Sequence, residues 1–247
     1  MESRSEAKRA IDAGLVRVGT NTAPKAATMV APDEPLHLES RPEPFVSRAG
    51  RKLDAALDAF CLDVSGLRAI DVGASTGGFT DCLLQRNIAS VTAVDVGYGQ
   101  MHWRIRSDER VEVVERTNFR TTDSSAYGPA FDLVVSDLSF ISLRTVSEQL
   151  VAVGAADARW ILLIKPQFEA GRERVGKGGI VRDATVRRDV IEEVIETFDT
   201  LGLGCVGIIE SPITGATGNV EYVAIFSRGD GTVSASTIES MFDGKSR

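Results

Sequence analysis

The sequence predicts an α/β fold with a mainly parallel sheet, and three patterns in it support that class. Short apolar runs alternate with helical or irregular stretches from residue 68 onward. Because these runs are apolar throughout, they are typical of parallel strands that helices cover on both faces. After a long helix predicted at Thr185–Phe198, two more apolar segments flank a turn-rich stretch, which suggests a closing hairpin. In order, the predicted strands are Ala69–Val72, Val91–Val94, Val111–Val114, Leu133–Val135, Ile161–Ile164, Cys205–Ile209 and Val220–Phe226.

Composition excludes several classes of protein. Hydrophobic residues make up 43% of the 247 residues and charged residues 26%, an ordinary balance for a soluble globular chain. Apolar runs such as Trp160–Ile164 are too short to cross a bilayer, and the first six residues lack the apolar core of a secretory signal. Cys61, Cys82 and Cys205 show no metal-ligand spacing, so we expect no metal site and reduced thiols in the cytoplasm.

The amino-terminal part is predicted to be a small separate unit. A helix at Ser5–Ala13 ends at Gly14, and a strand follows at Leu15–Val18. Residues Thr20–Pro35 are expected to be loop with one weak strand, and another strand is expected at Leu36–Glu39. A Pro-punctuated linker then leads to a helix at Ser47–Cys61, whose apolar residues repeat at helical spacing. The domain boundaries we expect are 1–40 for the first unit, 41–46 for the linker, 47–232 for the main domain and 233–247 for a tail.

The strongest local signal is a glycine-rich loop at Asp71–Phe79, between the first predicted parallel strand and a helix. Its glycines let the backbone pass close under a ligand, and Asp95 ends the next strand, where an acid can hold ribose hydroxyls. A dinucleotide would need Gly-x-Gly-x-x-Gly, which the loop lacks. S-adenosylmethionine has no pyrophosphate, and an acidic residue near the loop can complement its cationic amino-acid end. We therefore expect S-adenosylmethionine as the cofactor. The predicted cofactor-binding residues are Asp71, Gly73, Ala74, Ser75, Thr76, Gly77, Gly78, Phe79, Asp95, Asn118 and Asp137.

Two kinds of methyl transfer are disfavoured by residues that the sequence lacks. Methylation of exocyclic amines is often marked by Asn/Asp-Pro-Pro-aromatic after the fourth strand, where this chain has Asp137-Leu138-Ser139-Phe140. Carbon methylation of pyrimidines needs an activated cysteine, and none of the cysteines has such a setting. Methylation of oxygen therefore remains.

A hydroxyl nucleophile must lose its proton during transfer, and lysine can accept it if its pKa falls from about 10 toward 7–8. Lys165 follows a predicted strand, and a lysine at that end of a parallel strand points into the ligand crevice. Asp137 ends the neighbouring strand, Lys52 lies on the helix that leads into the domain, and Glu221 opens the last strand. The sequence thus offers Lys165 as a candidate base.

Six motifs, in the same order along the chain, resemble the TlyA family. The resemblance extends from about Ser3 to Phe226. It implies the FtsJ-like version of the class I methyltransferase fold, with a Rossmann-like sheet of seven strands and S-adenosylmethionine as methyl donor. It also implies 2′-O-methylation of cytidines in ribosomal RNA. The motifs are Ser47–Leu53, Asp71–Phe79, Asp95–Gln100, Asp137–Ser142, Lys165–Glu169 and Gly218–Tyr222.

The resemblance also implies roles for individual residues. In this family a Lys-Asp-Lys-Glu tetrad surrounds the target hydroxyl, and its positions fall on Lys52, Asp137, Lys165 and Glu221. We expect Lys165 to act as the base or to orient the hydroxyl, Lys52 to lower the pKa of Lys165, and the two acids to fix the ammonium groups.

The family usually begins with an S-four-type RNA-binding module of two helices and a small sheet. Residues 3–18 resemble only the second helix and the following strand of that module, so we expect a partial module at residues 1–40. Cations cluster here and in the loop after Lys165, although the net charge of the chain is −7. The predicted RNA contacts are Arg4, Lys8, Arg9, Arg48, Arg172, Arg174 and Lys177.

Three other functions stay open on sequence alone. The chain could methylate oxygen on another RNA or on a small molecule, although its basic segments favour a large RNA. It could be an inert RNA-binding protein, although such a protein needs neither the glycine loop nor the tetrad. The family name also carries a haemolysin label, but the chain has no apolar span and no cationic amphipathic helix for a membrane.

Overall fold

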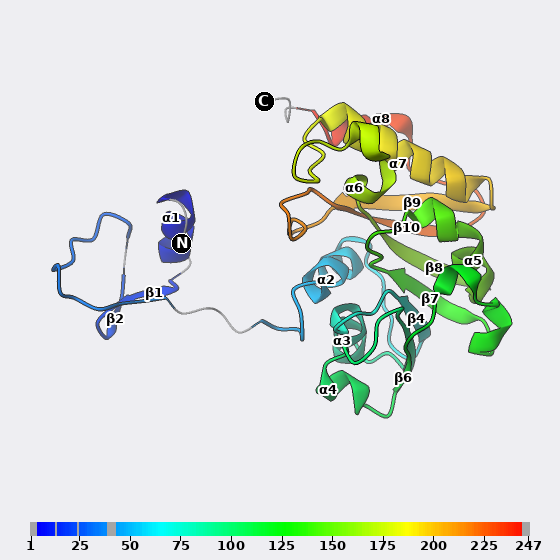
Figure 1. Cartoon of the computed structure of the whole chain (residues 1–247), viewed down its shortest axis with the longest axis horizontal. Helices are drawn as coiled ribbons and strands as arrows, with labels where there is room; N and C mark the ends of the chain where they lie inside the picture. Colours follow the sequence, from blue (N-terminus) through cyan, green and yellow to red (C-terminus); the bar gives the residue numbers. More distant parts are fainter. Residues whose placement is uncertain (1–3, 13, 24, 39–42, 244–247) are drawn as a thin grey trace. The chain divides into compact units, whose positions relative to one another are not determined.

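The computed structural model describes residues 4–12, 14–23, 25–38 and 43–243. The chain divides into two compact units, Met1–Pro44 and Phe45–Arg247 (Figure 1).

The first unit contains one helix and a small antiparallel sheet. Helix α1 (Arg4–Asp12) is followed by Gly14, whose φ of +70° stops the helix. The Gly14 amide donates to the Ile11 carbonyl at 2.9 Å and the Leu15 amide to the Ala10 carbonyl at 2.9 Å. Strands β1 (Val16–Val18), β2 (Asn21–Thr22) and β3 (Leu36–Leu38) lie in the order β2-β1-β3. The expected elements are therefore present here, while their identity as an RNA-binding module stays a prediction.

The second unit is built on a seven-stranded sheet in the order β6-β5-β4-β7-β8-β10-β9. Neighbouring strands are parallel except at β10, which pairs antiparallel with both β8 and β9. The mainly parallel sheet and its closing hairpin were both predicted, and the structure confirms them. The strands are β4 (Arg68–Val72), β5 (Ser90–Val94), β6 (Val111–Val114), β7 (Phe131–Ser136), β8 (Gly154–Ile164), β9 (Leu203–Glu210) and β10 (Tyr222–Arg228).

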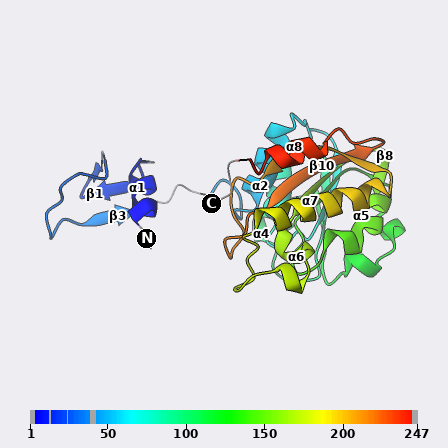
Figure 2. The same ribbon diagram turned by 90° about the horizontal axis from the view of Figure 1, so that it is seen from above.

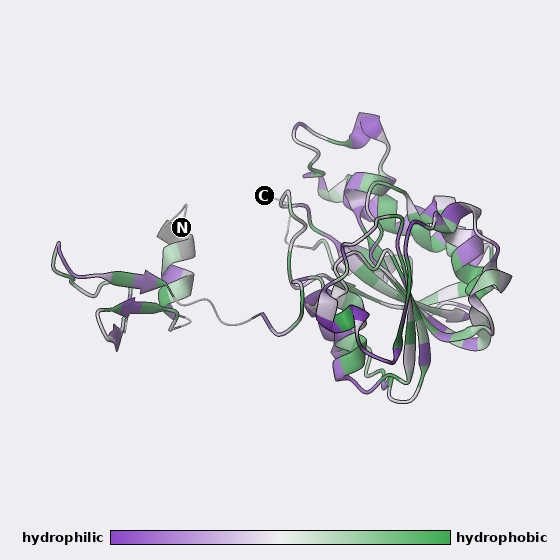
Figure 3. Ribbon diagram, turned by 60° about the horizontal axis from the view of Figure 1, so that its bottom comes forward, coloured by the Kyte–Doolittle hydropathy of each residue, from purple (hydrophilic) through white to green (hydrophobic). Residues whose placement is uncertain are grey.

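Helices cover both faces of this sheet (Figures 1 and 2). Successive residues of a strand point to opposite faces, so Leu133 packs in one core cluster, with α2 and α3, and Val134 in the other, with α5 and α7. Figure 3 shows hydrophobic stretches along the central strands. The helices are α2 (Gly50–Ala59), α3 (Gly78–Gln85), α4 (Trp103–Arg106), α5 (Ser147–Val153), α6 (Pro166–Glu169), α7 (Ala184–Asp199) and α8 (Ala235–Ser240), with short 3-10 turns η1 (Phe119–Thr121), η2 (Ser124–Tyr127), η3 (Leu143–Val146) and η4 (Arg172–Arg174).

Several element boundaries differ from the prediction. Strand β10 begins at Tyr222, so Glu221, which was predicted to open this strand, lies just before it. Helix α2 begins at Gly50 rather than at Ser47, because the preceding residues form a tight turn in which the Gly50 amide donates to the Ser47 carbonyl at 3.1 Å. Strand β8 begins at Gly154, well before the predicted start at Ile161. Its first half carries half-buried and exposed residues such as Asp157, so it lacks the continuous apolar pattern used to find it.

Candidate active site

The glycine loop between β4 and α3 is compact because of its backbone conformation. Gly77 takes a φ of +92° at the start of α3, a conformation that a residue with a side chain rarely adopts. A Cβ on Gly73 would lie 3.1 Å from the Asp137 carbonyl oxygen, so the loop passes directly against the end of β7. A Cβ on Gly78 would collide with the Ser47 hydroxyl. The loop thus brings α3, the end of β7 and the turn before α2 together.

Two aspartates at strand ends support this loop in different ways. Asp95, after β5, accepts hydrogen bonds from the Ser75 amide at 2.8 Å and from the Gly97 amide at 2.6 Å. Asp71, on β4, is fully buried, and its Oδ2 accepts from the Thr80 hydroxyl at 2.7 Å and from the Thr80 amide at 3.1 Å. Its Oδ1 has no hydrogen-bond partner within the described structure.

The Asp71 carboxyl titrates unusually. Its pKa is raised from 3.8 to about 7, mainly by burial and also by the nearby carboxylates of Asp137 and Asp95, while the two hydrogen bonds from Thr80 lower it. A buried acceptor without a partner, on the floor of a cavity, is suited to a cationic ligand group.

The four predicted catalytic residues lie together at the edge of the sheet. Lys165 Nζ lies 2.6 Å from Asp137 Oδ1, and Lys52 Nζ lies 3.5 Å from Asp137 Oδ2 and 2.7 Å from Glu221 Oε2. Both lysines are 6% exposed and Glu221 is 3% exposed. Each residue comes from a different segment, namely α2 and the loops next to β7, β8 and β10. The result is a chain of alternating charges, buried except for the half-buried Asp137, in which every ammonium contacts a carboxylate.

A cavity of about 630 Å³ joins the charge chain to the glycine loop. Asp71, Gly73 and Phe79 line it on the loop side, and Lys165 and Glu221 line it on the other side. A second hollow of about 350 Å³ shares Gly73, Ser75 and Asp137 with the first and extends to Asp95. Together they provide an acidic floor, a backbone cradle and an acid at the end of β5, which fit the amino-acid end and the ribose of S-adenosylmethionine.

Not every predicted cofactor residue lines these cavities. Ala74, Ser75, Thr76 and Gly78 do, whereas Gly77 shapes the loop without lining either cavity. Asn118 uses its side chain to cap η1, where it accepts from the Arg120 amide at 3.2 Å.

The predicted RNA contacts have different surroundings. Arg48 is exposed on the rim of the main cavity, and Arg172 and Lys177 are exposed on the loop after α6. Arg174 is half-buried, and its guanidinium bonds to both carboxylate oxygens of Glu193 and to the Ala170 carbonyl. Lys8 is exposed and lies 2.5 Å from Asp12. The side chains of Arg4 and Arg9 lie outside the described part of the structure.

Sequence reasoning missed several residues of the site. The Lys165 ammonium donates to the Ser139 hydroxyl at 2.8 Å, and the Gln167 amide donates to Glu221 Oε1 at 3.2 Å. Phe140 is 91% exposed with a φ of +64°, and its ring centroid lies 5.2 Å from that of Phe168. All four belong to the motifs that contain Asp137 and Lys165, so proximity in sequence to those residues was the available signal.

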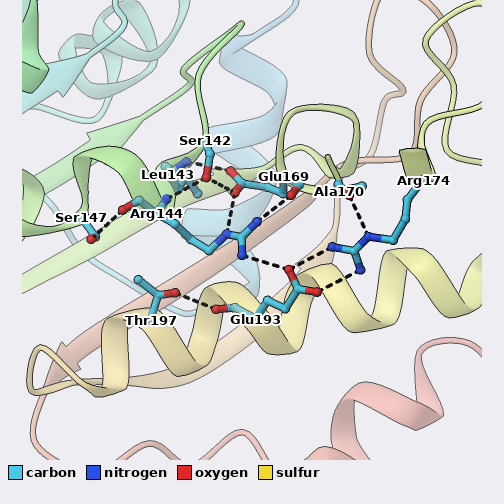
Figure 4. A network of polar contacts seen from close by, with 9 residues as sticks. All are labelled: Ser142, Leu143, Arg144, Ser147, Glu169, Ala170, Arg174, Glu193 and Thr197. Atoms are coloured by element: carbon cyan, nitrogen blue, oxygen red, sulfur yellow. Dashed lines mark hydrogen bonds and ion pairs between the residues drawn. The ribbon is translucent and has the colours of Figure 1, made fainter. Parts of the chain in front are cut away.

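A polar network beneath the site fixes the two loops that carry these residues (Figure 4). The buried Glu169 accepts from the Leu143 amide at 2.7 Å, from the Ser142 hydroxyl and from Arg144. Arg144 also lies 3.0 Å from Glu193 on α7. The segments after β7 and after β8 are therefore tied to each other and to α7.

Comparison with known proteins agrees with this geometry. Residues 45–228 match the model of the FtsJ-like methyltransferase family. The chain belongs to that family. A relative from Mycobacterium tuberculosis, the 16S/23S rRNA (cytidine-2′-O)-methyltransferase TlyA, is 48% identical over 89% of this chain and 82% of its own. Hemolysin A of Brachyspira hyodysenteriae is 38% identical over 91% of this chain and 94% of its own.

Solved structures give the same fold. A hemolysin-named protein from Lactococcus lactis superposes with a TM-score of 0.78 at 42% identity, covering 83% of this chain and 99% of its own. The predicted family, fold class and S-adenosylmethionine-dependent methyltransferase activity are therefore confirmed. None of the helices in the described ranges has the length and apolar character that crossing a membrane requires.

Proposed function

We propose that this methyltransferase methylates the ribose 2′-hydroxyl of cytidines in ribosomal RNA. The observation that carries the proposal is the buried chain Lys165–Asp137–Lys52–Glu221 on the wall of the cavity that also contains the glycine loop. Such a set can hold a hydroxyl and receive its proton. The name of the M. tuberculosis relative describes the same reaction.

The glycine loop and the two strand-end acids would hold the cofactor, which supplies the methyl group. Asp71 has a free carboxylate oxygen on the cavity floor for the cationic amino-acid end. Asp95 lies by the second hollow, where ribose hydroxyls would be bound. Because Asp95 also accepts from the Ser75 and Gly97 amides, it would keep the loop in shape as well.

Lys165 is the residue we assign to the target hydroxyl. Asp137 and Ser139 fix its Nζ from two sides, at 2.6 and 2.8 Å. As the hydroxyl oxygen forms its bond to the methyl carbon, its proton must leave. A neutral Lys165 amine would accept it, whereas an ammonium would orient the hydroxyl without accepting a proton. Lys52 would hold Asp137 in place through the 3.5 Å contact, and Glu221 would fix Lys52 through the 2.7 Å contact.

RNA would reach this cavity across an aromatic and cationic rim. Arg48, Arg172 and Lys177 are exposed cations suited to phosphates, and Phe140 presents a ring at the mouth of the cavity. The first unit would add affinity as a partial S-four-type module, with Arg4, Lys8 and Arg9 on its helix. An enzyme with this substrate would work in the cytoplasm.

The proposal can be tested by mapping 2′-O-methyl groups in the RNA of both ribosomal subunits, from cells with and without this protein. We expect at least one methylated cytidine that disappears with the protein and returns with the wild-type gene. Unchanged maps of both RNAs would contradict the assignment of ribosomal RNA as substrate.

A further inference from the structure

A third hollow, of about 390 Å³, lies beside the main cavity and is lined by none of the four tetrad residues. The two share Phe140, Gln167, Phe168 and Gly179 as a common wall. The far side of the hollow is formed by the loop after α6, including Val175. We infer that this hollow is a second nucleotide subsite, which takes the base of a nucleotide adjacent to the methylated one. This inference rests on the proposed RNA substrate.

The lining of the hollow has the chemistry that a nucleobase requires. Phe168 and Phe140 provide aromatic surfaces, and Ile141 and Val175 provide apolar ones. Bases of single-stranded RNA commonly stack on such rings. Arg172 is exposed and lines the same hollow, where a phosphate of the strand would be expected.

One polar group on the shared wall is also left for a ligand. The Gln167 amide nitrogen donates to Glu221 Oε1 at 3.2 Å, which fixes the orientation of the amide, since the opposite orientation would place oxygen against oxygen. Gln167 Oε1 has no hydrogen-bond partner among the described residues. The amino and imino groups of a base could donate a hydrogen bond to Gln167 Oε1 after a small rotation of the Gln167 side chain.

The subsite is preformed because hydrogen bonds hold its walls. On one side, Ser142 is fixed by Glu169, as in the network of Figure 4. On the other side, the buried Asn219 accepts from the Val181 amide at 2.9 Å and donates to the Gly179 carbonyl at 2.8 Å. Asn219 also donates to the Thr217 hydroxyl at 2.9 Å, so it joins the loop after α6 to the segment before β10. A preformed hollow loses little entropy when a base enters it.

The position of Phe140 explains why the neighbouring nucleotide would use this hollow. Its ring is 91% exposed, and it lines both the main cavity and the third hollow. A strand whose target nucleotide entered the main cavity would pass Phe140, and the next base along the strand would meet the third hollow.

The test uses synthetic RNA spanning the mapped cytidine, with an abasic ribose at the nucleotide on either side of it. For the wild-type enzyme, removal of the base at one of these positions should raise KM roughly tenfold, the usual effect of losing one stacked base. Val175→Phe should fill the hollow, raise KM for intact RNA, and remove most of the effect of the abasic site. Val175→Ala, which widens the hollow instead of filling it, should keep the effect of the abasic site, and the affinity for S-adenosylmethionine should not change in either variant.

Two results would overturn the inference while the proposed function stands. One is methylation of intact RNA with no effect of base removal at either position. The other is an equal effect in the wild type and in Val175→Phe. The wild-type comparison requires no variant, and Val175→Leu provides a smaller filling if Val175→Phe folds poorly. Failure of the wild type to methylate intact RNA would overturn the proposed function and this inference together.

Discussion

Replacing Asp71 by Asn is expected to remove a large pH dependence from the stability of the protein. The folded state holds the Asp71 proton up to a pKa of about 7, whereas the ordinary carboxyl releases it near 3.8. The stability that this proton gives is therefore fully present below about pH 4 and is lost as the pH rises toward 7. Each pH unit between the two pKa values is worth about 1.4 kcal/mol, so the total loss is about 4 kcal/mol.

Asn is a close replacement because its side-chain oxygen can still accept both hydrogen bonds from Thr80. The free energy of unfolding of Asp71→Asn minus that of the wild type should be about 3 kcal/mol larger at about pH 8 than at about pH 5. Urea unfolding without cofactor, at a series of pH values, measures this gap. Asp63→Asn, at an exposed carboxylate, controls for the loss of one negative charge. Parallel pH curves for the wild type and Asp71→Asn would refute the reasoning.

The remaining predictions concern the other parts of the site. Lys165→Ala should lower turnover on RNA by about 10²–10⁴ with S-adenosylmethionine binding intact, and near-normal single-turnover rates in Lys165→Arg would show that Lys165 is not a base. Asp95→Ala should weaken cofactor binding by about 1–3 kcal/mol in calorimetry, and unchanged affinity would remove Asp95 from the cofactor site. Arg172→Ala should reduce the salt dependence of RNA binding by about one phosphate contact without affecting stability. Arg174→Ala should mainly lower Tm, because the Arg174 guanidinium is held by Glu193. The opposite pattern would reverse the two roles. Glu169→Gln should cost about 2–3 kcal/mol and lower Tm by about 4–10 °C, and an unchanged Tm would mean that the network of Figure 4 adds little stability.

The sequence predicted the sheet and the charge chain because both depend on where strands end. Asp137 follows β7 and Lys165 follows β8, and the carboxyl ends of neighbouring parallel strands meet at one edge. Helix α2 and the loop before β10 then supply Lys52 and Glu221, which needed the family resemblance to be recognised as partners.

Other features depend on side-chain surroundings that spacing does not specify. Arg174 lies in a basic run, but its guanidinium is turned inward to Glu193, whereas Arg172 in the same run is exposed. Asp71 was expected to contact the cofactor. Its complete burial and its unpaired Oδ1 could not be predicted, because they depend on how α3 packs over β4. The contacts of Ser139 and Gln167 with the tetrad depend on rotamers and loop conformation rather than on residue type.

The most direct test of the account is the identity of the nucleoside that the purified protein methylates. Ribosomal RNA lacking the modification would be incubated with S-adenosylmethionine carrying a labelled methyl group and then digested to nucleosides. The account predicts label in 2′-O-methylcytidine with the wild type and almost none with Lys165→Ala, although that variant still binds the cofactor. Label in a base-methylated nucleoside, or equal labelling by Lys165→Ala, would contradict it.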